Sequence, residues 1–294
     1  MTEFFQQVVS GLALGSIYAA LALALVLIHR ATGVINFAQG EMAMFTTYIA
    51  WTLTTNHGWN DWLAYAATLA LAFIGGVGIQ RIVIRPVERA SILTIVIVTI
   101  GLVLVFNGAA AWIWTAEVQF FPSPFPNETV SIGDVAISVI DLGTIAVVSV
   151  LVVLLWAFFR FTKIGLALRA SALNPDASRL VGVRVGWMLA IGWGLAAMLG
   201  AVAGILTAPT TTLDPTMMQA ILIYAFAAAV LGGIDSPLGA VVGGLLLGVG
   251  LNLIGNYVDF VGADLRLPVA LLIILVVLLV RPAGLFGKQV LGRV

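Results

Sequence analysis

Long apolar stretches alternate with short polar, glycine-containing or proline-containing segments along the whole chain of 294 residues. A transmembrane α-helix needs about 20 mostly apolar residues, within a range of about 17 to 25. Nine stretches reach or approach this length, the seventh and ninth being short: 8–28, 36–55, 62–80, 91–112, 142–159, 187–207, 219–233, 238–255 and 267–280. The pattern predicts an all-α polytopic membrane protein of about nine helices, with residues 1–294 in a single transmembrane domain.

The composition supports the membrane class and excludes several others. Hydrophobic residues make up 62% and charged residues 9% of the chain, and the mean hydropathy is +1.14, as expected when lipid is the main solvent. The formal net charge is zero and no basic cluster occurs, so nothing indicates a nucleic-acid partner. Cysteine is absent, which excludes disulfides and thiolate metal sites. The apolar run from Leu12 to Ile28 is too long for a signal peptide and is expected to be a retained span.

The basic residues are unevenly distributed over the loops. If the N-terminus lies outside, every Lys and Arg except Arg266 falls on the cytoplasmic side: Arg30, Arg81, Arg85, Arg89, Arg160, Lys163, Arg169, Arg179, Arg184, Arg281, Lys288 and Arg293. Most acidic residues fall on the other side: Glu3, Asp61, Glu117, Glu128, Asp134, Asp141, Asp214, Asp259 and Asp264. Because loops rich in Lys and Arg stay in the cytoplasm, the distribution predicts an N-out, C-in topology.

The segment Lys163–Gly186, within a predicted cytoplasmic loop 160–186, is the longest charged segment between apolar spans. Asn174 can cap a helix, Pro175 suits its first position, and Asp176 faces the positive end of the helix dipole. Gly182 is a stop signal. The residues predict a short cytoplasmic helix whose apolar side, formed by Ala177, Leu180 and Val181, would bind a groove on a partner because a helix this short is unstable alone.

A second polar segment, Gly33–Phe45, interrupts the apolar pattern between the first two spans. Asn36 and Gln39 have the spacing of a capping pair, and Glu41 would lie in the first turn of the following helix. One interpretation is a capped helix start at the inner membrane boundary. The other is a broken helix beside the translocation path, because irregular backbone at membrane depth is tolerated where it lines a cavity or other protein.

The largest predicted outer loop covers residues 113–141. Its prolines and the alternation that follows them predict an extended lead-in and a small β-hairpin or amphipathic patch. It can be a simple lid or a docking element. Towards the C-terminus, the pairs Gly200/Gly204, Gly239/Gly243 and Gly244/Gly248 have a spacing that lets helices approach closely and are interpreted as packing faces. The run 230–244 predicts a tight inner turn.

The sequence shows no motif for ATP binding, metal binding or catalysis. No G-x-x-x-x-G-K-[ST] occurs, so ATP binding through a P-loop is not expected. His29 and His57 lie far apart at span ends, which does not indicate a metal pair. Glu41 is the main ionisable residue inside the spans, whereas ion-coupled carriers usually hold several. We therefore expect no catalytic residues, no metal and no cofactor in this chain.

Three segments together carry a family resemblance: GVINFAQGEMAMF, RASALNPDASRLVGV and AVLGGIDSPLGAVVGGLLLG. They resemble the corresponding segments of LivH-type permeases, the membrane subunits of branched-chain amino acid ABC importers, and the whole chain fits that family in length and order of spans. Gln39 stands where a histidine is common in the family. The family also serves urea, short amides and aromatic acids, so the resemblance does not give the substrate.

The resemblance implies a complex in the bacterial inner membrane. Its other members would be a LivM-like permease, two cytoplasmic ATPases of LivG and LivF type that bind ATP and Mg, and an external substrate-binding protein. It further implies that Pro175–Val181 is the coupling helix, with Arg169, Asn174 and Gly182 around it, and that Asn36, Gln39 and Glu41 mark a broken helix near the path. The alternatives are an energy-independent facilitator and a membrane-embedded enzyme, which would need clustered titratable groups.

Overall fold

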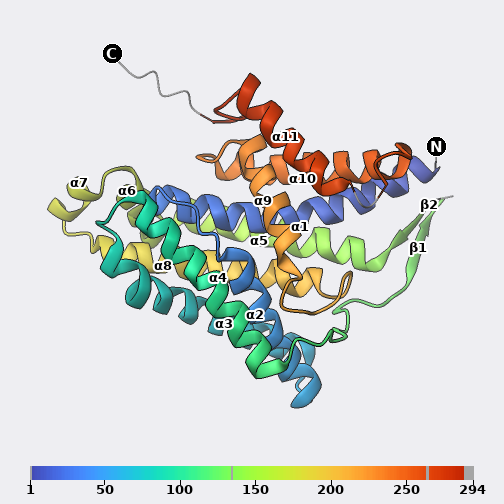
Figure 1. Cartoon of the computed structure of the whole chain (residues 1–294), viewed down its shortest axis with the longest axis horizontal. Coiled ribbons are helices and arrows are strands. Elements are labelled where there is room, and N and C mark those ends of the chain that lie inside the picture. Colours follow the sequence, from blue (N-terminus) through green and yellow to red (C-terminus); the bar gives the residue numbers. More distant parts are fainter. Residues whose placement is uncertain (1, 134, 263–264, 288–294) are drawn as a thin grey trace. The chain divides into compact units, whose positions relative to one another are not determined.

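The computed structural model describes residues 2–133, 135–262 and 265–287. Asp134, Asp264, Lys288 and Arg293, which contribute to the charge distribution above, lie outside the described residues. The described chain is almost entirely helical (Figure 1). Its α-helices are α1 Thr2–Thr32, α2 Gln39–Trp51, α3 Asp61–Ile79, α4 Ile92–Trp114, α5 Val139–Phe161, α6 Lys163–Leu173, α7 Pro175–Leu180, α8 Val185–Thr207, α9 Met218–Gly232, α10 Pro237–Tyr257 and α11 Arg266–Val280.

Each of the nine predicted spans corresponds to one of these helices. Six helical stretches in the described residues are long and apolar enough to cross a membrane: α1, α3 with its extension to Val87, α4, α5, α8 and α10. Helices α9 and α11 are shorter, as expected. Helix α2 continues as a π-helix over Thr52–Asn56, and α3 continues as a π-helix over Gln80–Ile84 and a 3-10 turn over Arg85–Val87. An all-α polytopic membrane fold is confirmed.

The chain divides into two compact units, and each is described by itself. The first unit comprises 1–26, 125–146 and 220–294. In it, α1 and α10 lie side by side (Figure 1). Their backbones can approach closely because glycines, which have no side chain, occupy the contact positions on both helices. A Cβ at Gly244 would lie 2.6 Å from the Cα of Ala19, and one at Gly248 would overlap the backbone of Gly15. The predicted packing role of the Gly244/Gly248 pair is confirmed.

The outer loop forms the predicted hairpin. Strands β1, Thr129–Ile132, and β2, Val135–Ser138, pair antiparallel. Two hydrogen bonds attach this region to the first helix: Gln6 Nε2 donates to the carbonyl of Ala136 at 3.0 Å, and Ser10 Oγ donates to Asp141 at 2.7 Å. The hairpin therefore lies beside the N-terminal end of α1 within this unit.

The turn between α9 and α10 is the tight turn that the sequence predicts. Gly233 has a φ of +107°, a conformation that favours glycine. Ser236 caps α10 by accepting a hydrogen bond from the N–H of Gly239 at 3.0 Å. A Cβ at Gly239 would overlap the carbonyl of Gly232, and one at Gly243 that of Ala228. The Gly239/Gly243 pair thus packs α10 against α9.

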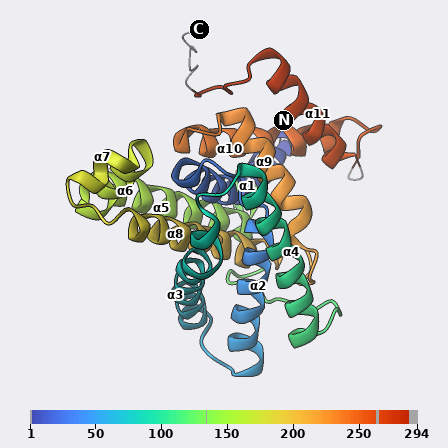
Figure 2. The same cartoon turned by 60° about the vertical axis from the view of Figure 1, so that its left-hand side comes forward.

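The second unit comprises 27–124 and 147–219. Helix α8 is its centre, since both α2 and α3 pack on it (Figure 2). A Cβ at Gly76 of α3 would lie 2.6 Å from the carbonyl of Trp193, and one at Gly204 would lie 2.8 Å from the carbonyl of Ala43 in α2. Helices α2 and α4 lie side by side, where Phe45 packs edge-on against Phe106 and Trp114. The Gly200/Gly204 pair is a packing face, as predicted.

Candidate functional site

The predicted cytoplasmic loop 160–186 is largely helical, which the sequence interpretation missed. Thr162 has extended backbone and ends α5, and its Oγ accepts a hydrogen bond from the N–H of Gly165 at 2.9 Å, so it caps a new helix, α6. A Cβ at Gly165 would overlap the carbonyl of Phe158, so glycine lets α6 turn back closely on α5. The capping residue Thr162, three residues before Gly165, is the local signal for the start of this helix.

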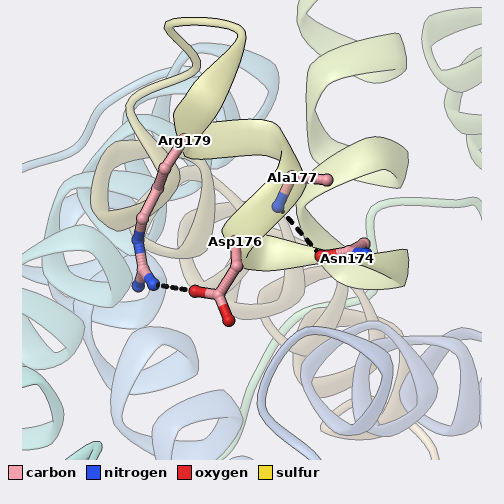
Figure 3. A network of polar contacts seen from close by, with 4 residues as sticks. All are labelled: Asn174, Asp176, Ala177 and Arg179. Carbon is pink, nitrogen blue, oxygen red and sulfur yellow. Dashed lines mark hydrogen bonds and ion pairs between the residues drawn. The ribbon is translucent and has the colours of Figure 1, made fainter.

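The short helix α7 begins as predicted (Figure 3). The side-chain oxygen of Asn174 accepts a hydrogen bond from the N–H of Ala177 at 2.9 Å, and Pro175 occupies the first turn. Arg179 donates to Asp176 at 2.7 Å, one turn away on an exposed surface. Such an exposed pair adds little stability, but it orients both side chains on one side of the helix.

The end of α7 is a complete Schellman motif around Gly182. The N–H of Gly182 donates to the carbonyl of Arg179 and that of Val183 donates to the carbonyl of Ser178, both at 3.0 Å. Gly182 has a φ of +84°, so its predicted role as the stop residue is confirmed. The helix ends at Leu180 and Val181 is its C-cap.

The apolar side of α7 is exposed in the described chain. Leu180 is 90% exposed and Val181 is 78% exposed, whereas Ser178 is buried. Ala177 is also exposed. Polar Ser178 therefore lies against the protein and the apolar residues point away from it, an arrangement that favours docking by a second protein. Arg169 lies in the middle of α6, half-buried, and is not part of the network around α7.

The polar segment Gly33–Phe45 contains a true interruption of helical structure, residues 33–38. Helix α1 ends at Thr32, where the N–H of Gly33 donates to the carbonyl of His29 at 2.7 Å and Gly33 has a φ of +72°. Helix α2 begins only at Gln39. The broken helix near Asn36 and Glu41 is thus present in the structure.

The expected capping pair is wrong in one respect. The N-cap of α2 is Ala38 and it makes no side-chain cap bond. Asn36 lies two residues earlier, where its Oδ1 accepts a hydrogen bond from the N–H of Ala38 at 3.1 Å. Its amide donates to Gln39 Oε1 at 3.2 Å and makes a longer contact of 3.4 Å with the sulfur of Met42. Asn36 therefore stabilises the turn before the helix, which leaves its amide free to bind Gln39.

Gln39 makes the contact that the sequence could not reveal. It is fully buried, and its Nε2 donates to the backbone carbonyl of Ala196 in the middle of α8 at 2.9 Å. A Cβ at Gly200, one turn further along α8, would lie 2.7 Å from the same nitrogen. Glycine at position 200 leaves the space that this amide occupies.

Glu41 lies in the first turn of α2 and is 2% exposed. The side chain of Asn107 on α4 hydrogen-bonds its carboxyl group. Its Oε2 has no hydrogen-bond partner among the described residues. The structure thus brings Asn36, Gln39 and Met42 into one buried polar group, with Glu41 on the same helix but with a different partner. No cluster of three or more potential metal ligands occurs in the described ranges.

Comparisons with known proteins agree with this architecture. A family model described as branched-chain amino acid transport system / permease component matches residues 7–280. The chain is 31% identical, over 99% of its length and 98% of the relative, to the high-affinity branched-chain amino acid transport system permease protein BraD of Pseudomonas aeruginosa. It is 30% identical, over 99% and 98%, to the LivH protein of the same description from Salmonella typhimurium.

Among solved structures, PsaBC from Streptococcus pneumoniae in complex with Fab aligns with a TM-score of 0.49 and 15% identity, covering 95% of this chain and 91% of that one. The apolar helices and the relatives identify a multi-pass protein of the bacterial inner membrane. Because the family model covers nearly the whole chain and the relatives match from end to end, this chain belongs to the family of permease components of branched-chain amino acid transport systems.

Proposed function

We propose that this chain is the membrane-spanning permease subunit of an ABC importer, that it translocates branched-chain amino acids or a related small polar solute such as urea or short amides, and that ATP hydrolysis in partner subunits drives it. Family membership supports the permease role. The names of the relatives BraD and LivH support the substrate class.

The observation that carries the coupling to ATPases is the form of α7. It is a short helix with a side-chain cap at its start and a Schellman motif at its end, so its own residues determine both of its ends. Its apolar residues Leu180 and Val181 are exposed. A helix of this length gains stability from tertiary contacts and not from propensity, and burial in the groove of a partner supplies such contacts.

The proposed complex contains three kinds of protein partner. Two cytoplasmic ATPases would bind ATP and Mg and receive α7. A second, LivM-like permease would complete the translocation path, and an external substrate-binding protein would select and deliver the solute. The lipid bilayer surrounds the exposed apolar faces of the helices. In this arrangement the permease needs few specific contacts with the solute.

Changing Leu180 to Asp tests the proposal. Burying one leucine side chain contributes about 1.5–3 kcal/mol, and a buried carboxylate without a partner adds a further cost. We therefore expect the affinity for the ATPases to fall by at least about tenfold, which corresponds to about 1.4 kcal/mol. Uptake, ATPase co-purification and membrane abundance should be measured together, and the variant should insert normally but lose both its ATPases and its uptake.

Leu180→Met is the matched control, because it keeps an apolar side chain of similar volume. This variant should retain both its ATPases and its uptake. Normal uptake by Leu180→Asp at normal abundance would overturn the role of α7. Retention of any ATPase subunit by the wild-type complex in detergent would itself argue against an energy-independent facilitator.

A further inference from the structure

The connection between α7 and α8 is short, and most of its backbone N–H groups donate hydrogen bonds. After the Schellman motif, the N–H of Val185 donates to the carbonyl of Val183 at 2.9 Å and α8 begins immediately. Ser178, which accepts the bond from Val183, is buried against the protein. Since the two helices are joined by a short, hydrogen-bonded connection and not by a flexible loop, a displacement of α7 must also displace the start of α8.

Helix α8 is held firmly along its length by α3. The guanidinium carbon of Arg81 lies 3.7 Å from the centre of the Trp187 ring, a cation–π contact near the start of α8. Further along, a Cβ at Gly194 would lie 3.0 Å from the carbonyl of Phe73, so the two backbones are almost in contact. Close-packed helices move as rigid bodies and do not deform continuously.

A chain of hydrogen bonds then joins α8 to the interrupted segment. The carbonyl of Ala196 accepts from Gln39 Nε2, Gln39 Oε1 accepts from the amide of Asn36, and Asn36 Oδ1 accepts from the N–H of Ala38. Both Asn36 and Gln39 are fully buried, so water does not compete for these bonds. Every residue in this chain belongs to the second unit.

The carbonyl of Ala196 does not need Gln39 in order to be satisfied. In the interior of an α-helix, each carbonyl already accepts from the N–H four residues later. The bond from Gln39 is therefore additional, and Gly200 is the residue that makes room for it. If the role of Gln39 were only structural, its buried amide would need a hydrogen-bond acceptor, but that acceptor would not have to be the carbonyl of Ala196.

We propose that Gln39 is a positioning residue that links the backbone break at 33–38 to α8, so that a displacement of α7 by the ATPases changes the conformation of the break. The proposal rests on the function proposed for α7. In this proposal, the Gln39–Ala196 hydrogen bond transmits the movement of α8 to the interrupted segment.

Gln39→Met tests the proposal in the complete reconstituted importer, because methionine has a similar size but no N–H to donate. The measurement is the ratio of substrate-stimulated to basal ATP hydrolysis, together with the transport rate and the half-saturating concentration of loaded binding protein. We expect the maximal transport rate and the stimulation ratio to fall about tenfold, the scale of losing one buried hydrogen bond and leaving its neighbours unpaired, with little change in the half-saturating concentration.

Three further variants and one control separate positioning from folding. Gly200→Ala should lower the stimulation ratio similarly, since its methyl group would displace the Gln39 amide. The double variant Gln39→Met/Gly200→Ala should be no worse than either single change, because both remove the same bond. Gln39→His, which keeps a side-chain N–H, should restore most of the ratio. Gly192→Ala on the same helix meets nothing within 4 Å and is the matched control that should behave as wild type.

The outcomes distinguish this inference from the proposed function. If Leu180→Asp abolishes transport while Gln39→Met transports normally, the positioning role of Gln39 is wrong and the role of α7 stands. If Gln39→Met and Gly200→Ala lose stimulation additively, or if Gln39→His is as defective as Gln39→Met at equal abundance, the hydrogen bond is not the link. If Leu180→Asp transports normally, the proposed function fails whatever Gln39 does.

Discussion

At the scale of single residues, Glu41 is the most exceptional side chain in the second unit. It is a carboxyl group at 2% exposure inside an apolar helix, with a hydrogen bond from Asn107 and a second oxygen that has no partner among the described residues. Buried ionisable groups in membrane spans often carry protons, but such relays continue through further ionisable groups. In this sequence the other predicted spans contain essentially none.

We therefore predict a local structural role for Glu41. Glu41→Gln keeps the shape of the side chain and its ability to accept the hydrogen bond of Asn107, so uptake should remain within about threefold of wild type, the change expected for a weakened but not abolished hydrogen bond. Uptake should be measured over a range of external pH with membrane abundance as the control. A complete, pH-independent loss of uptake in a normally assembled complex would contradict this prediction.

At the scale of secondary-structure elements, the packing of α1 on α10 depends on positions without side chains. Gly11 and Gly15 on α1 face Gly244 and Gly248 on α10, and an added Cβ at any of them would lie within 2.8 Å of the opposite backbone or overlap it. Without a hydrophobic driving force between helices in lipid, such close van der Waals contact holds them together along with hydrogen bonds, here from Asn252 and Asn256 of α10 to Gln7 of α1.

Gly248→Ala should therefore destabilise the protein by about 1–3 kcal/mol, the usual cost of overpacking a close interface. Gly250→Ala, on the same helix with nothing within 4 Å of the added methyl group, should be neutral or slightly stabilising. The fraction of each variant that stays monodisperse in detergent after heating measures the difference. Equal behaviour of the two variants would show that α1 and α10 do not pack in this way.

At the scale of the whole molecule, the charges of the loops predict the orientation of the chain in the membrane. The uneven distribution of Lys and Arg predicts that the outer hairpin and the turn after Val87 lie on opposite sides. Asn127, before β1, and Ala90, before α4, are both exposed.

Single cysteines at these two positions test the orientation, because the natural chain contains no cysteine. Asn127→Cys should react with a membrane-impermeant maleimide in intact cells, whereas Ala90→Cys should react only after the membrane is opened. Both variants should keep wild-type uptake, which serves as the control for correct insertion. Labelling of both positions from outside would contradict the predicted N-out, C-in topology.

Features that depend on neighbouring residues alone were predictable from the sequence. The nine apolar helices follow from local hydropathy, since a span in lipid must satisfy its backbone within its own residues. The start and end of α7 follow from Asn174, Pro175 and Gly182, because a cap acts over three or four positions. The hairpin in the outer loop follows from alternation between turn residues.

Features that depend on distant residues were decided only by the tertiary structure. The glycine pairs indicate close packing, but nothing in them says that Gly248 faces Gly15 or that Gly200 makes room for Gln39. Helix α6 is not predictable in the same way, because the close contact of Gly165 with α5, which turns the chain back, joins residues that only the tertiary structure brings together. Asn36 and Gln39 resemble a capping pair locally, yet Gln39 bonds Ala196, 157 positions away, since a buried amide takes whichever acceptor the packing of helices brings within reach.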